Sequence, residues 1–421
     1  MDAAKQKTFQ PQKMGYFTDA LLVNILDFPA YHIECISERH FLVAGGGGSS
    51  KTGVINQFNI LELVPNDNSC LAEIVTKYTI PDDVSNEAIM NGAIMRDLPI
   101  CNTKFVALGC QATIYHIRFN PRTRAFDIND YYSLQSPSPR TELKSIAYST
   151  GRIYTGTVDG LLDVWDTGLN DKKLLKEFKS HNKEVDEIDI DTINQQILTL
   201  SRGEARIILW NASNFEIIRE FKKDFVNEQA NKTGNFYRSC RFIYDRLNSS
   251  NNNSGKGSVL LMATNSAQSK GTPSVSTLHR VSNIDSNSLN KFSNSVTTDG
   301  IMAMTISLDG KNVAIGTRTG CVMILDTVRL NRIYKFEKAH QNSVTDLEFL
   351  PPKPESLVVT NSEVCPLISV SLDRRIVLHR PRKSSLGLTI VKIVFVIALI
   401  YLLAFSDITF TRPNASPPID A

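Results

Sequence analysis

The sequence predicts an all-β domain built from repeated four-stranded units and followed by one apolar helix. A strand-and-turn pattern recurs along the first 380 residues, and an uninterrupted apolar stretch lies near the C-terminus. A loop with five glycines between two strands adds a candidate site. The 46 basic residues nearly balance the 43 acidic ones, and 42% of residues are hydrophobic. This composition describes an ordinary folded domain and argues against a strongly basic nucleic-acid binder.

Four segments share one ending, in which a tight polar turn precedes an alternating strand. These segments are 157–166, 203–211, 317–326 and 371–380. A matching start, a histidine followed by a polar strand, occurs at 180–189 and 339–348. Trp165 and Trp210 lie 45 residues apart, which is the length of one four-stranded blade. The pattern is that of WD repeats, and we therefore predict a seven-bladed WD-repeat β-propeller over residues 1–380.

The blades are predicted in chain order. Blade one surrounds the glycine-rich loop, and blades three and four hold the two tryptophans. The other predicted bounds are 31–63 for blade one, 88–118 for blade two, 237–281 for blade five, 300–336 for blade six and 340–380 for blade seven. We expect the N-terminal segment to add a strand to blade seven and so cover a sheet edge. Two polar insertions, 248–257 and 282–298, are predicted to be disordered surface loops.

The histidines and carboxylates of the repeats are expected to be structural rather than catalytic. In this repeat a histidine and a turn aspartate hydrogen-bond within a blade. We predict this pair for His340 and Asp373, and Glu204 stands where blade four should have its aspartate. The seven cysteines all precede the apolar stretch and lack C-x-x-C or zinc-finger spacing. We therefore expect buried thiols and no metal or redox centre built from them.

The apolar stretch 386–405 is long enough to cross about 30 Å of hydrocarbon as a helix. Its only charge is Lys392, and basic residues precede it whereas the tail after it carries only Arg412. The positive-inside rule then places the large N-terminal part in the cytosol. The N-terminus is polar, so no secretory signal is expected. We predict a propeller at 1–380, a basic juxtamembrane linker at 381–385, a transmembrane helix at 386–405 and a tail at 406–421.

The glycine-rich loop spans residues 44–56. It resembles a phosphate-cradling loop, GxxxxGK[ST], but Ser50 occupies the last glycine position and a β-branched strand follows instead of a helix. Three interpretations stay open from the local pattern: a wide hairpin, a nucleotide-hydrolysing site, and a protruding loop that binds a partner or an ion.

The whole pattern resembles one family, the endoplasmic-reticulum guanine-nucleotide exchange factors for the Arf-like GTPase that starts COPII coat assembly. This is the prolactin regulatory element-binding protein family. The resemblance covers the architecture of the whole chain and is most specific at the four glycines 45–48, the four-residue spacer and the segment 53–56. It implies a potassium-binding loop that activates the GTPase, made of Gly45, Gly46, Gly47, Gly48, Ser49, Ser50, Lys51, Thr52, Gly53 and Asn56.

The resemblance also implies a mechanism without covalent catalysis. Neutral backbone carbonyls of residues 45–53 and Asn56 Oδ1 would surround a potassium ion, with Ser49 to Thr52 at the tip. The ordered loop would stabilise the nucleotide-free GTPase. The implied location is the endoplasmic-reticulum membrane, with a cytosolic N-terminal domain and a lumenal C-terminus. Two other classes remain: a membrane-tethered WD-repeat scaffold without exchange activity, and a transcription regulator.

Overall fold

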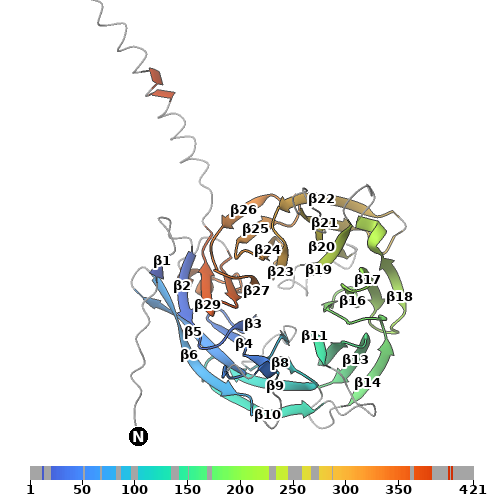
Figure 1. The fold of residues 1–421 in the computed structure, drawn as a ribbon, viewed down its shortest axis with the longest axis horizontal. Helices are drawn as coiled ribbons and strands as arrows, with labels where there is room; N and C mark the ends of the chain where they lie inside the picture. The colour runs from blue at the N-terminus through green and yellow to red at the C-terminus, as the bar shows by residue number, and fades with distance from the viewer. Residues whose placement is uncertain are drawn as a thin grey trace, which may run out of the picture. The chain divides into compact units, whose positions relative to one another are not determined.

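A computed structural model describes residues 12–13, 20–50, 53–66, 69–81, 87–95, 103–133, 142–149, 151–167, 173–226, 234–244, 258–266, 275–286, 288–360, 365–381, 397–398 and 400–401. The chain divides into two compact units, Met1–Pro381 and Arg382–Ala421. Within the first unit, the described strands form seven antiparallel sheets arranged in a ring (Figure 1). The predicted seven-bladed propeller is therefore confirmed.

Each of the first six blades is one four-stranded sheet, ordered from the innermost strand outward along the chain. Blade one holds β3 (Ala30–Cys35), β4 (His40–Gly45), β5 (Gln57–Asn66) and β6 (Ser69–Thr79), with the short 3-10 helix η1 (Gly48–Ser50) between β4 and β5. Blade two holds β7 (Asn91–Ile94), β8 (Lys104–Cys110), β9 (Thr113–Asn120) and β10 (Ala125–Ser133). Blade three holds β11 (Leu143–Ser149), β12 (Arg152–Thr157), β13 (Leu161–Asp166) and β14 (Leu174–Lys179).

The next three blades repeat this order. Blade four holds β15 (Glu187–Asp191), β16 (Gln196–Ser201), β17 (Arg206–Asn211) and β18 (Ile217–Phe221), and the 3-10 helix η2 (Lys223–Val226) follows. Blade five holds β19 (Asn235–Ile243), β20 (Val259–Ser266), β21 (Ser276–Ser282) and β22 (Asn290–Thr297). Blade six holds β23 (Ile301–Ile306), β24 (Asn312–Thr317), β25 (Val322–Asp326) and β26 (Arg332–Phe336).

Blade seven closes the ring with strands from both ends of the domain. It joins β27 (Val344–Phe349), β28 (Leu367–Ser371) and β29 (Arg375–His379) to β2 (Ala20–Ile25) and β1 (Gln12–Lys13), and the short helix α1 (Pro354–Thr360) lies between β27 and β28. β2 pairs antiparallel with β29, as expected for an N-terminal strand that covers a sheet edge. The seven innermost strands contact one another in sequence, and β27 contacts β3. The main-chain pairing of β2 with β29 inside blade seven thus joins the two ends of the domain and closes the ring.

The hydrophobic core lies between neighbouring blades. One cluster joins Leu42 and Phe58 of blade one to Val106 and Tyr115 of blade two, all at most 1% exposed. Similar clusters join each of the six remaining pairs of adjacent blades. Because both faces of each sheet are covered, the middle strands are buried on both faces; in β4 every residue is buried.

The expected histidine–carboxylate pairs are present. His340 Nδ1 lies 3.1 Å from Asp373 Oδ1, and its Nε2 lies 2.8 Å from Ser369 Oγ. In blade four, His181 Nδ1 lies 3.2 Å from Glu204 Oε2, so the glutamate replaces the aspartate of the repeat. These side chains are bonded within the blades, and their structural assignment is confirmed. Six cysteines among the described residues are buried free thiols: Cys35, Cys70, Cys110, Cys240, Cys321 and Cys365.

The prediction for the insertion at 282–298 is wrong. Residues Asn290–Thr297 form β22, the outermost strand of blade five, which pairs along its length with β21. An outermost strand is largely exposed, so it needs main-chain pairing more than apolar side chains. Its serines also bond to the neighbouring strand, since His279 Nδ1 lies 2.8 Å from Ser293 Oγ. The other polar insertion, 248–257, lies wholly outside the described residues.

The expected transmembrane helix falls mostly outside the described residues. Of 386–405 only residues 397, 398, 400 and 401 are described, and these are helical. Among the residues that the structure places, no helix combines the length and the apolar character needed to span a membrane.

Candidate functional site

The glycine-rich loop connects β4 to β5 at one end of the propeller. Gly45, the last residue of β4, pairs with Ala30, the first residue of the innermost strand β3. Because the blades repeat the same topology, the innermost strands all begin at this end, which we call the loop end. The chain after the loop is strand β5 and not a helix. It therefore lacks the helix N-terminus that binds the phosphates after a phosphate-cradling loop.

Two glycines are required where the loop leaves β4. A methyl group on Gly45 would lie 2.1 Å from the Pro29 carbonyl oxygen. Gly46 has a φ of +146°, and a methyl group there would lie 2.2 Å from Asn56 Oδ1. The Gly46 N–H donates to the Pro29 carbonyl at 3.1 Å. The loop therefore passes closely over the chain on both sides, which only glycine permits at these positions.

Asn56 fixes the loop through both its side chain and its main chain. It is 8% exposed, and its Oδ1 accepts a hydrogen bond from the Gly48 N–H at 2.9 Å. The Asn56 carbonyl accepts from the Ile80 N–H at 2.9 Å, in the connection between blades one and two. The asparagine side chain thus bridges the two arms of the loop, and its main chain joins the loop to the next blade.

The base of the loop is also fixed by charge. The Gln57 amide donates to Asp27 Oδ1 at 2.6 Å, and Lys77 pairs with Asp27 Oδ2 at 2.7 Å. Asp27 lies in the connection from β2 to β3, so three segments meet under the loop. A rigid base allows the tip to be presented in a defined direction.

The tip is exposed. Ser49 is exposed within η1, and Ser50 is the last residue of that turn. Gly53 has a φ of +74° and no atom within 4 Å of the place where a side chain would begin. Lys51 and Thr52 lie outside the described residues. The structure therefore brings Gly45, Gly46, Gly48 and Asn56 together and leaves Ser49 and Gly53 facing solvent.

The oxygen set of the loop fits a monovalent cation in its chemistry. Asn56 Oδ1 is a neutral amide oxygen that faces the inside of the loop, and the glycines add neutral carbonyls. The Gly48 N–H points at the same oxygen, so a cation there would share Oδ1 through its second lone pair or replace this hydrogen bond. No group of three or more His, Cys, Asp or Glu side chains suited to a metal ion occurs within the described ranges.

A second charged feature was missed by the sequence analysis. Arg202, Arg238 and Arg241 meet at the central channel of the propeller, although they come from two blades. Nothing in the sequence marks them, because Arg202 lies in the β16–β17 turn, Arg238 and Arg241 lie in β19, and no motif links the two segments. Only a link between positions 202 and 238, such as covariation, would have pointed to their contact.

Fold and loop together define a class: a WD-repeat-type propeller that presents a glycine-rich loop fixed by a buried asparagine. Its relatives are consistent with that class. The chain is 23% identical over 398 residues to "Guanine nucleotide-exchange factor SEC12" of Mus musculus, covering 84% of this chain and 88% of the mouse protein. It is 22% identical over 395 residues to the Rattus norvegicus protein of the same name, with the same coverage. The resemblance to this exchange-factor family is confirmed.

Other comparisons add less. "SEC12-like protein 2" of Arabidopsis thaliana is 38% identical over 85 residues, which cover 20% of this chain and 19% of that protein. No protein-family profile matches the chain. Two crystal structures of Sqt1 from Chaetomium thermophilum superpose with TM-scores of 0.53 and 0.52 at 12% and 13% identity. They cover 82% of this chain and 80% and 79% of theirs, and they support the propeller fold alone.

Proposed function

We propose that this protein is a guanine-nucleotide exchange factor for a small GTPase and that the glycine-rich loop is its active element. One observation carries the proposal: the loop is shaped by contacts at Gly45, Gly46 and Asn56 and yet leaves Ser49 and Gly53, on either side of the tip, exposed. The similarity to SEC12 over most of the chain supports the same function. Nucleotide exchange requires no covalent step, so the proposal needs no catalytic group in the loop.

The loop acts by differential binding. An exchange factor accelerates GDP release when it binds the nucleotide-free GTPase more tightly than the GDP-bound form. A loop that is already fixed loses little conformational entropy on docking, so more of its contact energy is available for that discrimination. The Asn56 bridge to Gly48 supplies this order at the centre of the loop. The tip residues 49–53 are the part that enters the nucleotide site of the GTPase.

Potassium is the proposed cofactor of the loop. Asn56 Oδ1 and carbonyls of Gly45 to Gly53 would hold it, and the bound ion would add further order to the loop. The chain's own residues supply the fixed base through Asp27, Gln57 and Lys77. The ion is therefore an addition to a loop that the protein has already shaped.

The proposed setting is the endoplasmic-reticulum membrane, with the Arf-like GTPase of the COPII coat as partner. The apolar stretch 386–405 would anchor the chain, with the propeller in the cytosol and the C-terminal tail in the lumen. Anchoring raises the effective concentration of the factor beside the membrane that the activated GTPase enters.

The direct test replaces Asn56 by alanine. Asn56→Ala removes the bridge to the Gly48 N–H, so the tip loses its fixed position while the blades keep their core. We expect a fall in exchange rate of at least tenfold with little change in thermal stability. Asn342→Ala is the matched control, because Asn342 is an exposed asparagine in the connection between blades six and seven. Release of a fluorescent GDP analogue from the GTPase measures both variants.

The same assay tests the cation. Replacing potassium by lithium should lower the wild-type rate, because lithium is too small and too strongly hydrated for a cage of carbonyls. Wild-type exchange by Asn56→Ala together with indifference to the cation would refute the ion-ordered loop. A wild-type chain that releases no GDP would instead favour the tethered scaffold.

A further inference from the structure

The central channel of the propeller has a volume of about 560 Å³ and is lined by residues of all seven innermost strands. Near the loop end, five of these strands carry a β-bulge at one residue. The bulged residues are Tyr31, Lys144, Arg238, Met302 and Thr345. A bulge re-aims a side chain away from the sheet, and all five residues line the channel. They form a ring at its entrance.

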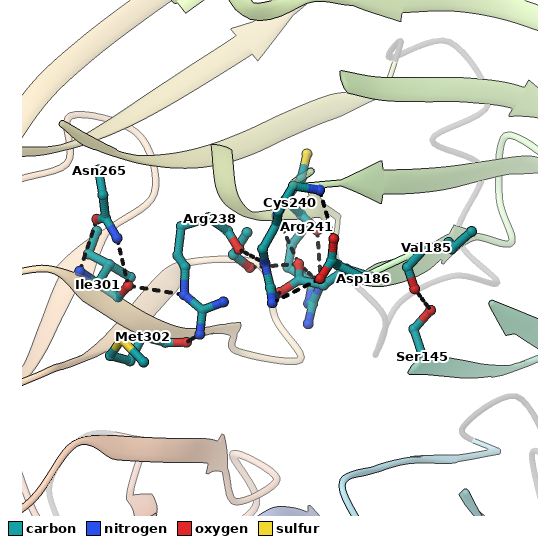
Figure 2. Close-up of polar contacts among 12 residues, drawn as sticks. Ser145, Val185, Asp186, Arg238, Cys240, Arg241, Asn265, Ile301 and Met302 are labelled. Atoms are coloured by element: carbon teal, nitrogen blue, oxygen red, sulfur yellow. Dashed lines mark hydrogen bonds and ion pairs between the residues drawn. The ribbon is translucent and has the colours of Figure 1, made fainter. Parts of the chain in front are cut away.

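Arg238 is held in this ring by main-chain atoms (Figure 2). Its Nε donates to the Ile301 carbonyl at 3.1 Å, and its Nη2 donates to the Met302 carbonyl. The Arg238 carbonyl accepts from Arg202 Nε at 2.9 Å, which fixes the bulge from the other side. These bonds place the guanidinium between blades five and six without neutralising its charge.

The neighbouring cations all have carboxylate partners. Arg202 pairs with Asp186 at 3.3 Å and with Glu187 at 3.1 Å, and Arg241 pairs with Glu187 at 2.7 Å. Lys144, the other basic member of the ring, pairs with Glu184 at 3.1 Å. Arg238 forms no such ion pair with any residue that the structure describes. Burial, and then repulsion from Arg202, lower the pKa of the Arg238 guanidinium to about 10, and attraction to Glu187 and Asp186 offsets this only in part. An incoming anion would relieve this charge.

Several large apolar side chains are exposed at the loop end. Phe236 is the second residue of β19, Met90 directly precedes β7, and Leu372 lies in the β28–β29 turn, so all three are at the loop end. They are 39%, 52% and 39% exposed, and Ile55 in the glycine-rich loop is 53% exposed. Arginine and exposed large apolar side chains on one end of a domain are residue types that protein-binding surfaces favour.

We propose that the entrance of the channel is a second contact for the GTPase, in which Arg238 receives an aspartate or glutamate side chain of that partner. This inference rests on the proposed function, because it assigns the same partner to a site apart from the glycine-rich loop. The exposed apolar residues Phe236, Met90 and Leu372 at the same end of the propeller offer further contact area to this partner. Among the acidic residues of the lining, Glu142 directly precedes β11 and lies at the entrance, whereas Asp186 and Glu187 pair with Arg202 and Arg241. Glu34, Asp189 and Glu348 lie further along their strands and repel any anion that passes the entrance.

The test separates binding from the chemistry of the loop. We expect Arg238→Gln, in the full-length chain, to raise the GTPase concentration needed for half-maximal exchange by about 10- to 100-fold, which is the loss of one charge-assisted hydrogen bond. The maximal rate should stay unchanged, whereas Asn56→Ala lowers it. Arg238→Lys keeps the charge and should retain part of the affinity. Arg122→Glu, an exposed arginine in the β9–β10 turn, is the control.

Salt and charge reversal give independent readouts. The wild-type half-maximal concentration should rise with salt more steeply than that of Arg238→Gln. Arg238→Glu should be rescued by reversing one surface Asp or Glu of the GTPase to Arg. Equal half-maximal concentrations and equal salt dependence for wild type and a folded Arg238→Gln would overturn the proposal, as would failure of every reversal to rescue. Absence of exchange by the wild type would overturn the proposed function as well, so the two failures are distinct.

Discussion

Gly46→Ala should disable the loop far more than Gly53→Ala, although both glycines have positive φ. At Gly46 the φ of +146° costs a residue with a side chain about 1–3 kcal/mol. The new methyl group would lie 2.2 Å from Asn56 Oδ1, and displacing Asn56 loses its bond to Gly48, which adds about 1 kcal/mol. The sum of about 2–4 kcal/mol lowers the population of the observed loop shape about 30- to 700-fold.

Gly53 provides the matched comparison. Its φ of +74° costs about 1–2 kcal/mol, but the space around it is open and no contact is lost. The reduced freedom of the unfolded chain returns up to about 1 kcal/mol. We therefore expect a decrease in exchange rate of no more than about tenfold for Gly53→Ala.

The assay is release of a fluorescent GDP analogue from the GTPase, with thermal unfolding as the check on folding. Because the loop can change shape while the blades stay packed, both variants should keep a midpoint close to that of the wild type. Equal exchange rates for the two folded variants would refute the reasoning, since they would show that the contact of Gly46 with Asn56 does not shape the active loop.

Three further outcomes are expected. Burial, and then Lys291, lower the pKa of His279 to about 4. Because the unfolded chain takes up the proton at a higher pH than the folded protein, the free energy of unfolding in urea should fall by about 2 kcal/mol from pH 7.5 to 5. His279→Gln should flatten this decline. Asp373→Ala removes the acceptor for His340 and for the Gln341 N–H, so the free energy of unfolding should drop by about 2–4 kcal/mol with unchanged exchange per folded molecule. Protease added to intact microsomes should digest the propeller, and a protected fragment of propeller size would contradict the cytosolic topology.

Much of the fold was predictable because its signals are local. The tight turns, the alternating strands after them and the 45-residue interval between Trp165 and Trp210 each depend on a few neighbouring residues. The strand β22 was not predictable in this way. Its serines and asparagines read as a loop, and only pairing with β21 makes the segment a strand.

The same distinction between local and long-range signals applies to the candidate site. The sequence by itself determined which residues form the loop, because glycine spacing and Asn56 are visible along the chain. Tertiary structure decided that Asn56 bonds to Gly48 and that Pro29 limits Gly45, since these contacts depend on how the chain crosses itself. The channel arginines show the same limit: Arg202 and Arg238 are 36 residues apart and meet only when blades four and five pack side by side. Local patterns specify strands and turns, whereas long-range packing specifies which charges face one another.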